Sequence, residues 1–187
     1  MIINKRKITA LLASSLLSFG LSAQTKAISN GVIYWEGSKI TTDSHVGTLD
    51  ISQGTLTFEA DAIVNGKFIV DMNSMVCTDL SEKAGARLVS HLESDDFFGV
   101  AAHPEAILKF TNAVPTAEGY KITGEFTIRG ITNTETFELN LDGNTAAAEF
   151  EIDRSKYNVK YKSGSFFENL GDKLINDELK LRVSFTY

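Results

Sequence analysis

The chain has 187 residues, a formal net charge of −6 and a pI near 5.1. This length suits one domain that can bury a core without disulfide or metal cross-links. The acidic balance disfavours binding through a basic face, so we expect no nucleic-acid partner. The single cysteine, Cys77, has no partner for an intramolecular disulfide and no histidine placed beside it by the sequence. We interpret it as a small buried side chain rather than a catalytic thiol.

The first 23 residues have the pattern of a secretory signal peptide. Lys5-Arg6-Lys7 precedes an apolar run from Ile8 to Leu21, and the small residues Ser22-Ala23 follow. The apolar run is short for a membrane span, so we expect no transmembrane anchor. Without these three basic residues, 15 basic residues face 24 acidic ones and the formal net charge becomes −9. We therefore predict a signal peptide at 1–23, a single domain at 24–187, and a periplasmic or secreted protein.

Apolar and polar side chains alternate with a period of two from Gly31 to the C-terminus, which predicts strands. The clearest case is 120–129, where Tyr120, Ile122 and Phe126 share one face with Gly124 and Ile128. The other predicted strands cover 31–40, 45–52, 56–60, 68–72, 106–112, 137–141, 146–152 and 179–187. Only residues 80–92 predict a helix, with Ser81 as its N-cap.

Turn residues separate several of these strands. Asn65-Gly66 predicts a two-residue hairpin, and Gln53-Gly54, Gly130 and Gly143-Asn144 predict further breaks. Eight or nine strands joined mostly by short turns favour an all-β fold, an antiparallel barrel of about eight strands with one short helix, because closure buries one face and removes the edges. The longest connections carry Phe97-Phe98 and Phe166-Phe167, which we predict at the barrel mouth, facing each other.

A barrel of this size is just wide enough to be filled by side chains or to hold one small ligand, and composition does not choose between the two. Small inward residues such as Ala60, Gly124, Ala146 and Ala148 would leave room along the axis. A hollow interior would be apolar and would bind a hydrocarbon-like ligand by burial of area. The predicted wall and mouth residues are Phe58, Phe68, Val70, Met72, Phe97, Phe98, Phe110, Tyr120, Ile122, Phe126, Phe137, Phe150, Phe166, Phe167, Leu181 and Phe185.

The sequence lacks the common catalytic motifs that we searched for. No nucleophile elbow or phosphate loop is present, and the three histidines, His45, His91 and His103, form no metal-binding motif. We therefore expect no catalytic residues, no metal and no cofactor. One basic run, Arg154, Lys156, Lys160 and Lys162, alternates with tyrosines. It fits either a contact with a headgroup or membrane surface, or an ordinary solvated edge.

The chain from about Trp35 to the C-terminus resembles the YceI family of secreted lipid-binding proteins, and the most specific matches lie in the segment 91–132. The matching residues are His91-Leu92, Ser94, Asp96-Phe97-Phe98, Val100, Pro104, Lys109-Phe110-Thr111, Gly119-Tyr120, Gly124 and Thr127-Ile128-Arg129-Gly130-Ile131-Thr132. Asp43 with His45, and Arg154 with Tyr157-Asn158-Val159, match more loosely, and Glu93 and Gly99 depart from the family pattern. The resemblance implies a lipocalin-like barrel that holds a polyisoprenoid, an isoprenoid quinone or a similar long-chain amphiphile. It makes His45, Arg154 and Tyr157 candidates for contact with a headgroup.

We therefore predict a noncatalytic protein that binds, transports or sequesters an isoprenoid-type lipid in the bacterial cell envelope. Peripheral contact with a membrane and a dimeric state are both compatible with the sequence. Two alternatives stay open at this point: a structural or inhibitory protein-interaction module with a filled barrel, and a hydrolase or isomerase that acts on the bound lipid.

Overall fold

The computed structural model describes residues 23–41 and 43–187, so residues 1–22 of the predicted signal peptide lie outside the described residues. The elements in chain order are β1 (Gln24–Ala27), β2 (Ser29–Ser38), β3 (Ser44–Glu59), β4 (Ala62–Cys77), α1 (Glu82–Glu93), β5 (Glu105–Pro115), β6 (Gly119–Ile128), β7 (Ile131–Asp142), β8 (Thr145–Asp153), the 3₁₀ turns η1 (Arg154–Tyr157) and η2 (Gly171–Lys173), and β9 (Glu178–Thr186).

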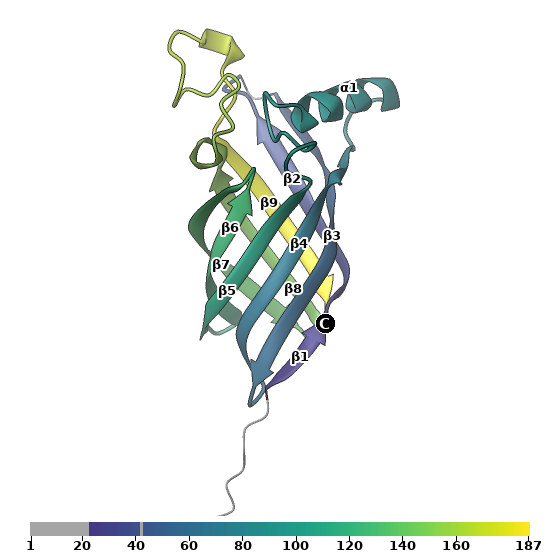
Figure 1. Cartoon of the computed structure of the whole chain (residues 1–187), viewed down its shortest axis with the longest axis vertical. Coiled ribbons are helices and arrows are strands. Elements are labelled where there is room, and N and C mark those ends of the chain that lie inside the picture. Colours follow the sequence, from purple (N-terminus) through teal and green to yellow (C-terminus); the bar gives the residue numbers. More distant parts are fainter. Residues whose placement is uncertain (1–22, 42) are drawn as a thin grey trace, which may run out of the picture.

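Strands β2 to β9 form one closed antiparallel barrel (Figure 1). Each strand pairs with its neighbours in the order β3-β2-β9-β8-β7-β6-β5-β4, and β4 also pairs with β3, so the eight strands form a complete ring. The short β1 lies outside this ring and pairs only with the end of β3. The predicted antiparallel barrel with one helix is confirmed, and β1 is an addition that the alternation did not predict.

The predicted hairpin at Asn65-Gly66 is wrong. The turn between β3 and β4 is at Ala60-Asp61, where both residues have positive φ, and β4 runs without interruption through Gly66. The ring of Phe110 lies over Gly66, so that a Cβ there would come within 2.6 Å of it. Glycine is needed at this position for close packing inside the strand. Ala60 is therefore a turn residue and does not point into the barrel.

The predicted break at Gln53-Gly54 is also wrong, because β3 continues from Ser44 to Glu59. Its pairing with β4 only shifts register between Ile51 and Gln53. The side chain of Ile28 covers Gly54, and a Cβ there would lie 2.5 Å from it. The breaks predicted at Gly130 and Gly143-Asn144 are real turns, and both glycines have positive φ.

The two ends of the barrel differ in construction. At one end, which we call the mouth, lie residues 39–41 and 43 and the connections 78–104, 129–130 and 154–177, with α1 beyond the ends of β3 and β4 (Figure 1). At the other end, the far end, lie tight turns, β1 and the C-terminus. Ser81 is the residue before α1, as predicted, although its side chain makes no capping hydrogen bond. No helix in the described part of the chain is long and apolar enough to cross a bilayer.

A single buried arginine holds the long connection 154–177 to the barrel. Arg154 is 1% exposed, and its guanidinium donates to the carbonyls of Asn176 at 3.1 Å, Val159 at 3.0 Å and Ile175 at 3.0 Å. Asp177 Oδ1 lies 3.2 Å from Nη2 and forms an ion pair rather than a well-directed hydrogen bond. Burial lowers the pKa of Arg154, and the Asp177 carboxylate opposes that effect. The connection thus has a fixed shape.

Replacing Arg154 with methionine should lower the free energy of unfolding by about 3–5 kcal/mol, because Asp177 and three carbonyls lose their partner. Urea unfolding followed by circular dichroism measures this loss. Arg129→Met is the matched control, since this half-buried arginine donates to the carbonyls of Asn158 and Asp95. It should cost only about 1 kcal/mol. Equal losses in the two variants would contradict the role given to Arg154.

Candidate functional site

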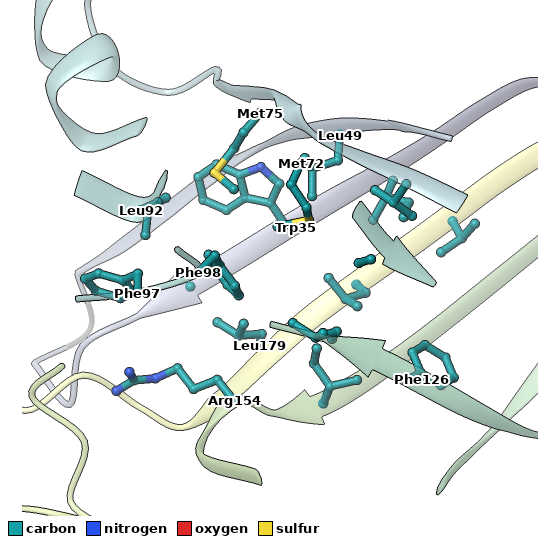
Figure 2. A pocket seen from close by; sticks show the side chains of 18 of the residues that line it. Trp35, Leu49, Met72, Met75, Leu92, Phe97, Phe98, Phe126, Arg154 and Leu179 are labelled. Atoms are coloured by element: carbon teal, nitrogen blue, oxygen red, sulfur yellow. The ribbon is translucent and has the colours of Figure 1, made fainter. Parts of the chain in front are cut away.

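The barrel is hollow on the mouth side of its centre. A cavity of about 370 Å³ lies between its strands, and side chains of all eight barrel strands, α1 and the connection 94–104 line it. Figure 2 shows Trp35, Met72, Met75 and Leu49 on one side, Phe97 and Phe98 toward one end, and Arg154 and Leu179 opposite Trp35. Most of the wall is aliphatic or aromatic.

Strand β9 shows directly that the interior is not filled. Its alternate residues Leu179, Leu181 and Val183 line the cavity, yet each is only half-buried. An inward side chain in a filled barrel would lose nearly all of its accessible surface. These residues retain accessible surface because the cavity is beside them.

Aromatic rings form a floor across the barrel. The ring centre of Phe68 lies 5.1 Å from that of Phe185 and 6.5 Å from that of Phe110. Beyond this floor, toward the far end, Leu56 and Ile122 are completely buried. The cavity is therefore closed at the far end, and its depth is set by these three phenylalanines.

The connection after α1 folds back over the mouth and inserts Phe97 and Phe98. The backbone N–H of Phe98 donates to the Leu92 carbonyl at 3.0 Å, and Gly99 turns the chain with a φ of 58°. Phe97 is 6% exposed and Phe98 is half-buried, and both line the cavity. They form part of the wall at the mouth.

A cluster of aromatic and polar side chains borders the mouth beside Phe97. The His91 ring meets Phe97 and Tyr161 edge-on, with ring centres 5.0 Å and 4.6 Å away. His91 Nε2 lies 3.4 Å from Asp96 Oδ2, and Lys162 Nζ lies 5.0 Å from the Tyr161 ring centre. This cluster offers hydrogen-bonding groups to the mouth end of an otherwise apolar cavity.

A second polar network includes His45, at the start of β3. His45 Nδ1 lies 2.9 Å from Asp79 Oδ2, and the N–H of Val46 donates to Asp79 Oδ1 at 3.1 Å. Burial by itself would raise the pKa of Asp79, but hydrogen bonds from His45, Cys77 and Val46 outweigh it and lower that pKa to about 2. Burial raises the pKa of the Cys77 thiol, so this cysteine is not an activated thiolate at neutral pH.

Most of the residues predicted for the wall meet at this cavity. Those that line it are Phe68, Val70, Met72, Phe97, Phe98, Phe110, Phe126, Phe137, Phe150, Leu181 and Phe185. Two of the headgroup candidates, His45 and Arg154, also line it, at the mouth end. The donors of Arg154 are directed to backbone carbonyls of the connection 154–177.

The structure places the other predicted residues elsewhere. Phe58, Tyr120 and Ile122 belong to the packed core and do not line the cavity, because the aromatic floor separates them from it. The hydroxyl of Tyr157 donates to Glu135 at 3.2 Å, and this side chain is completely buried. Burial and the Glu135 carboxylate raise the pKa of Tyr157, which therefore stays neutral.

The prediction that Phe166-Phe167 faces Phe97-Phe98 across the mouth is wrong. Phe166 is 42% exposed and Phe167 is 49% exposed, and neither lines the cavity. Their backbone N–H groups both donate to the Ser163 carbonyl, in a tight turn that directs the pair outward.

Several lining residues were missed by the sequence analysis. Trp35, Leu49, Met75, Leu92 and Tyr161 all line the cavity. The inward direction of Trp35 could have been predicted from the alternation of residues in the predicted strand 31–40. The position of Tyr161 could not, because it depends on how the connection 154–177 folds back.

Nothing in the described part of the chain groups three His, Cys, Asp or Glu side chains so that they could hold a metal ion. The site therefore consists of an apolar chamber that is closed at the far end, with a polar rim that includes two histidines at the mouth.

Curated relatives match a large part of the sequence. The chain is 28% identical over 143 residues to a UPF0312 protein of Yersinia enterocolitica, in an alignment that covers 73% of this chain and 71% of that protein. It is 32% identical over 98 residues to Protein YceI of Escherichia coli O157:H7, covering 52% of this chain and 49% of that protein.

Solved structures share the fold. BcnA of Burkholderia cenocepacia has a TM-score of 0.65 at 19% identity, covering 84% of this chain and 96% of BcnA. A polyisoprenoid binding domain from Saccharophagus degradans has a TM-score of 0.57 at 11% identity, covering 89% of this chain and 98% of that domain.

The profile of the YceI-like domain matches residues 23–187, which include all the strands of the barrel and the entire cavity wall. This match confirms the resemblance seen in the sequence from about Trp35 to the C-terminus, and the chain belongs to the family of YceI-like domains.

Proposed function

We propose that this protein binds a long-chain isoprenoid-type lipid, such as a polyprenyl compound or an isoprenoid quinone, without converting it. The observation that carries the proposal is the apolar cavity of about 370 Å³ that is closed at the far end and polar at the mouth. Pockets that hold small molecules are typically hollow, mostly apolar and of this size. The cavity favours lipid binding over a filled barrel that works only through protein contacts.

The size of the cavity limits how much lipid it can enclose. If each methylene group takes roughly 30 Å³, about the volume of one water molecule in the liquid, the cavity holds on the order of a dozen methylene groups. Burying them contributes about 10 kcal/mol before ordering costs are subtracted. A longer tail must extend through the mouth or widen the cavity.

The polarity of the wall predicts the orientation of the ligand. The floor consists of Phe68, Phe110 and Phe185, whereas His45, His91 and Lys162 lie at the mouth. A polar headgroup at the floor would lose its hydrogen bonds to water without finding new ones. The tail therefore enters first, and the headgroup stays beside the polar residues.

A structural neighbour supports the class of ligand. The domain from Saccharophagus degradans, which shares this fold, is described as binding polyisoprenoid. The proposed location in the periplasm or outside the cell rests on the sequence pattern of residues 1–23.

The first test is to purify the protein without detergent from the envelope of its own host, extract it with organic solvent, and identify bound lipid by mass spectrometry. We expect a polyprenyl compound or an isoprenoid quinone at close to one molecule per chain. A protein that is empty and also fails to take up added isoprenoid quinone would contradict the proposal.

Filling the cavity should block binding. In Leu181→Trp the indole occupies space that the tail needs, so we expect at least a tenfold loss of bound quinone with little change in thermal stability. Lys180→Trp is the matched control, because Lys180 is exposed on the outer face of the same strand. Gel filtration followed by extraction measures the bound lipid. Equal loading of both variants would show that the tail does not occupy this cavity.

Binding without conversion predicts that a quinone or polyprenyl phosphate incubated with the protein is recovered with its mass unchanged. Chromatography with mass detection checks this. Formation of a product that is lost in His45→Gln or His91→Gln would instead establish an enzyme that acts on the bound lipid. Product formed equally by these variants would indicate a contaminant.

A further inference from the structure

Exposed apolar side chains gather beside the mouth. Ile40, Phe166 and Phe167 are 58%, 42% and 49% exposed. Their two connections are joined, because the N–H of Ile40 donates to the Leu174 carbonyl at 3.1 Å. In Figure 1 the connection 154–177 stands beyond the strand ends, on the side of the mouth away from α1. These three side chains therefore belong to one projecting edge of the molecule.

The projecting edge is braced, so its exposed rings are held in place. The hydroxyls of Ser163 and Ser165 donate to Asp177 Oδ2 at 2.8 Å and 2.7 Å, and the N–H of Ile175 donates to the Lys162 carbonyl at 3.0 Å. Arg154 joins the same segment to the barrel. Because the turn is already ordered, binding through these rings costs little additional conformational entropy.

Lysines accompany the exposed rings. Lys160 Nζ lies 5.1 Å from the Phe166 ring centre, and Lys173 is exposed in η2. Within the described residues, neither lysine has a carboxylate within ion-pair distance. Glu168, Asp172 and Asp177 are the acidic residues of the connection 154–177. One lysine without an ion-pair partner, Lys160, therefore lies beside an exposed aromatic ring, and a second, Lys173, is exposed on the same connection, although the net charge of the protein is −6.

The edge is continuous with the cavity. A shallow depression shares Tyr161 and Lys162 with the wall of the cavity. Its other lining residues are Asp95, Asp96, Arg129, Asn158, Lys160, Phe167 and Leu170. A surface that bound at Phe166 and Phe167 would therefore lie next to the mouth.

From these contacts we propose that the edge formed by Ile40, Lys160, Phe166, Phe167 and Lys173 docks on an anionic lipid bilayer. Phenylalanine rings enter the boundary between headgroups and acyl chains, and lysines are attracted to anionic headgroups. Docking in this way places the mouth at the membrane, so a tail can pass between bilayer and cavity with little exposure to water. This inference rests on the proposed lipid binding for its purpose, although docking itself does not require a loaded cavity.

The test is cosedimentation of the purified protein with vesicles of phosphatidylcholine alone and of phosphatidylcholine with phosphatidylglycerol. We expect binding to the anionic vesicles, about tenfold weaker in Phe166→Ser/Phe167→Ser. Lys160→Gln/Lys173→Gln should lose a similar factor for anionic vesicles and little for neutral ones. Tyr34→Ser/Val114→Ser is the control, since these residues are 47% and 51% exposed away from this edge, and it should bind as the parent protein does.

A parent protein that binds neither kind of vesicle, or a phenylalanine variant that binds as well as the control, would overturn the docking proposal. Loading with lipid is measured separately, by uptake of quinone in solution without vesicles. Loss of vesicle binding in the phenylalanine variant with normal quinone uptake supports docking. Vesicle binding by a protein that takes up no quinone would support docking while contradicting the proposed function.

Discussion

The antiparallel pairing of β2 with β9 joins the first and last strands of the ring and closes the sheet, and the remaining architecture depends on that closure. A closed ring of eight strands has an interior whose width is set by strand number and tilt, so its content depends on which side chains point inward. Glycines in the strands let large side chains lie close to the backbone of the wall: Phe110 lies over Gly66, and Trp35 lies over Gly47. These contacts let rings pack flat against the wall.

The interior of the barrel has a filled part and a hollow part, because the side chains that point inward differ along the barrel axis. Toward the far end, Phe68, Phe110 and Phe185 pack across the barrel, and Leu56 and Ile122 fill the space beyond them. Toward the mouth, strands are joined by long connections whose side chains border the hollow without filling it. A chamber with one closed and one polar end results, which is the form expected for a ligand with a long tail and a small polar head.

Two connections at the mouth each carry a pair of adjacent phenylalanines, and the two pairs have different physical roles. Phe97-Phe98 turns inward because the backbone after α1 hydrogen-bonds back to the helix end. Phe166-Phe167 turns outward because the segment that carries it is fixed by Arg154 and by the Ser163 carbonyl. One pair thereby becomes cavity wall, while the other is left free to contact a surface outside the molecule.

The strands, the single helix, the antiparallel barrel and most of the apolar wall could be predicted from the pattern of residues, since a period of two assigns each side chain to a face. The sequence pattern did not distinguish a turn glycine from a glycine beneath a large side chain, so Asn65-Gly66, under Phe110, and Gln53-Gly54, under Ile28, were misread as breaks. Three features became visible only in the folded chain: the barrel is hollow, Phe58 and Ile122 lie beyond the floor, and Tyr157 and Phe166-Phe167 do not line the cavity. The physical reason is that long connections take their conformation from distant hydrogen bonds, such as those of Arg154, which leave no periodic signal in the sequence.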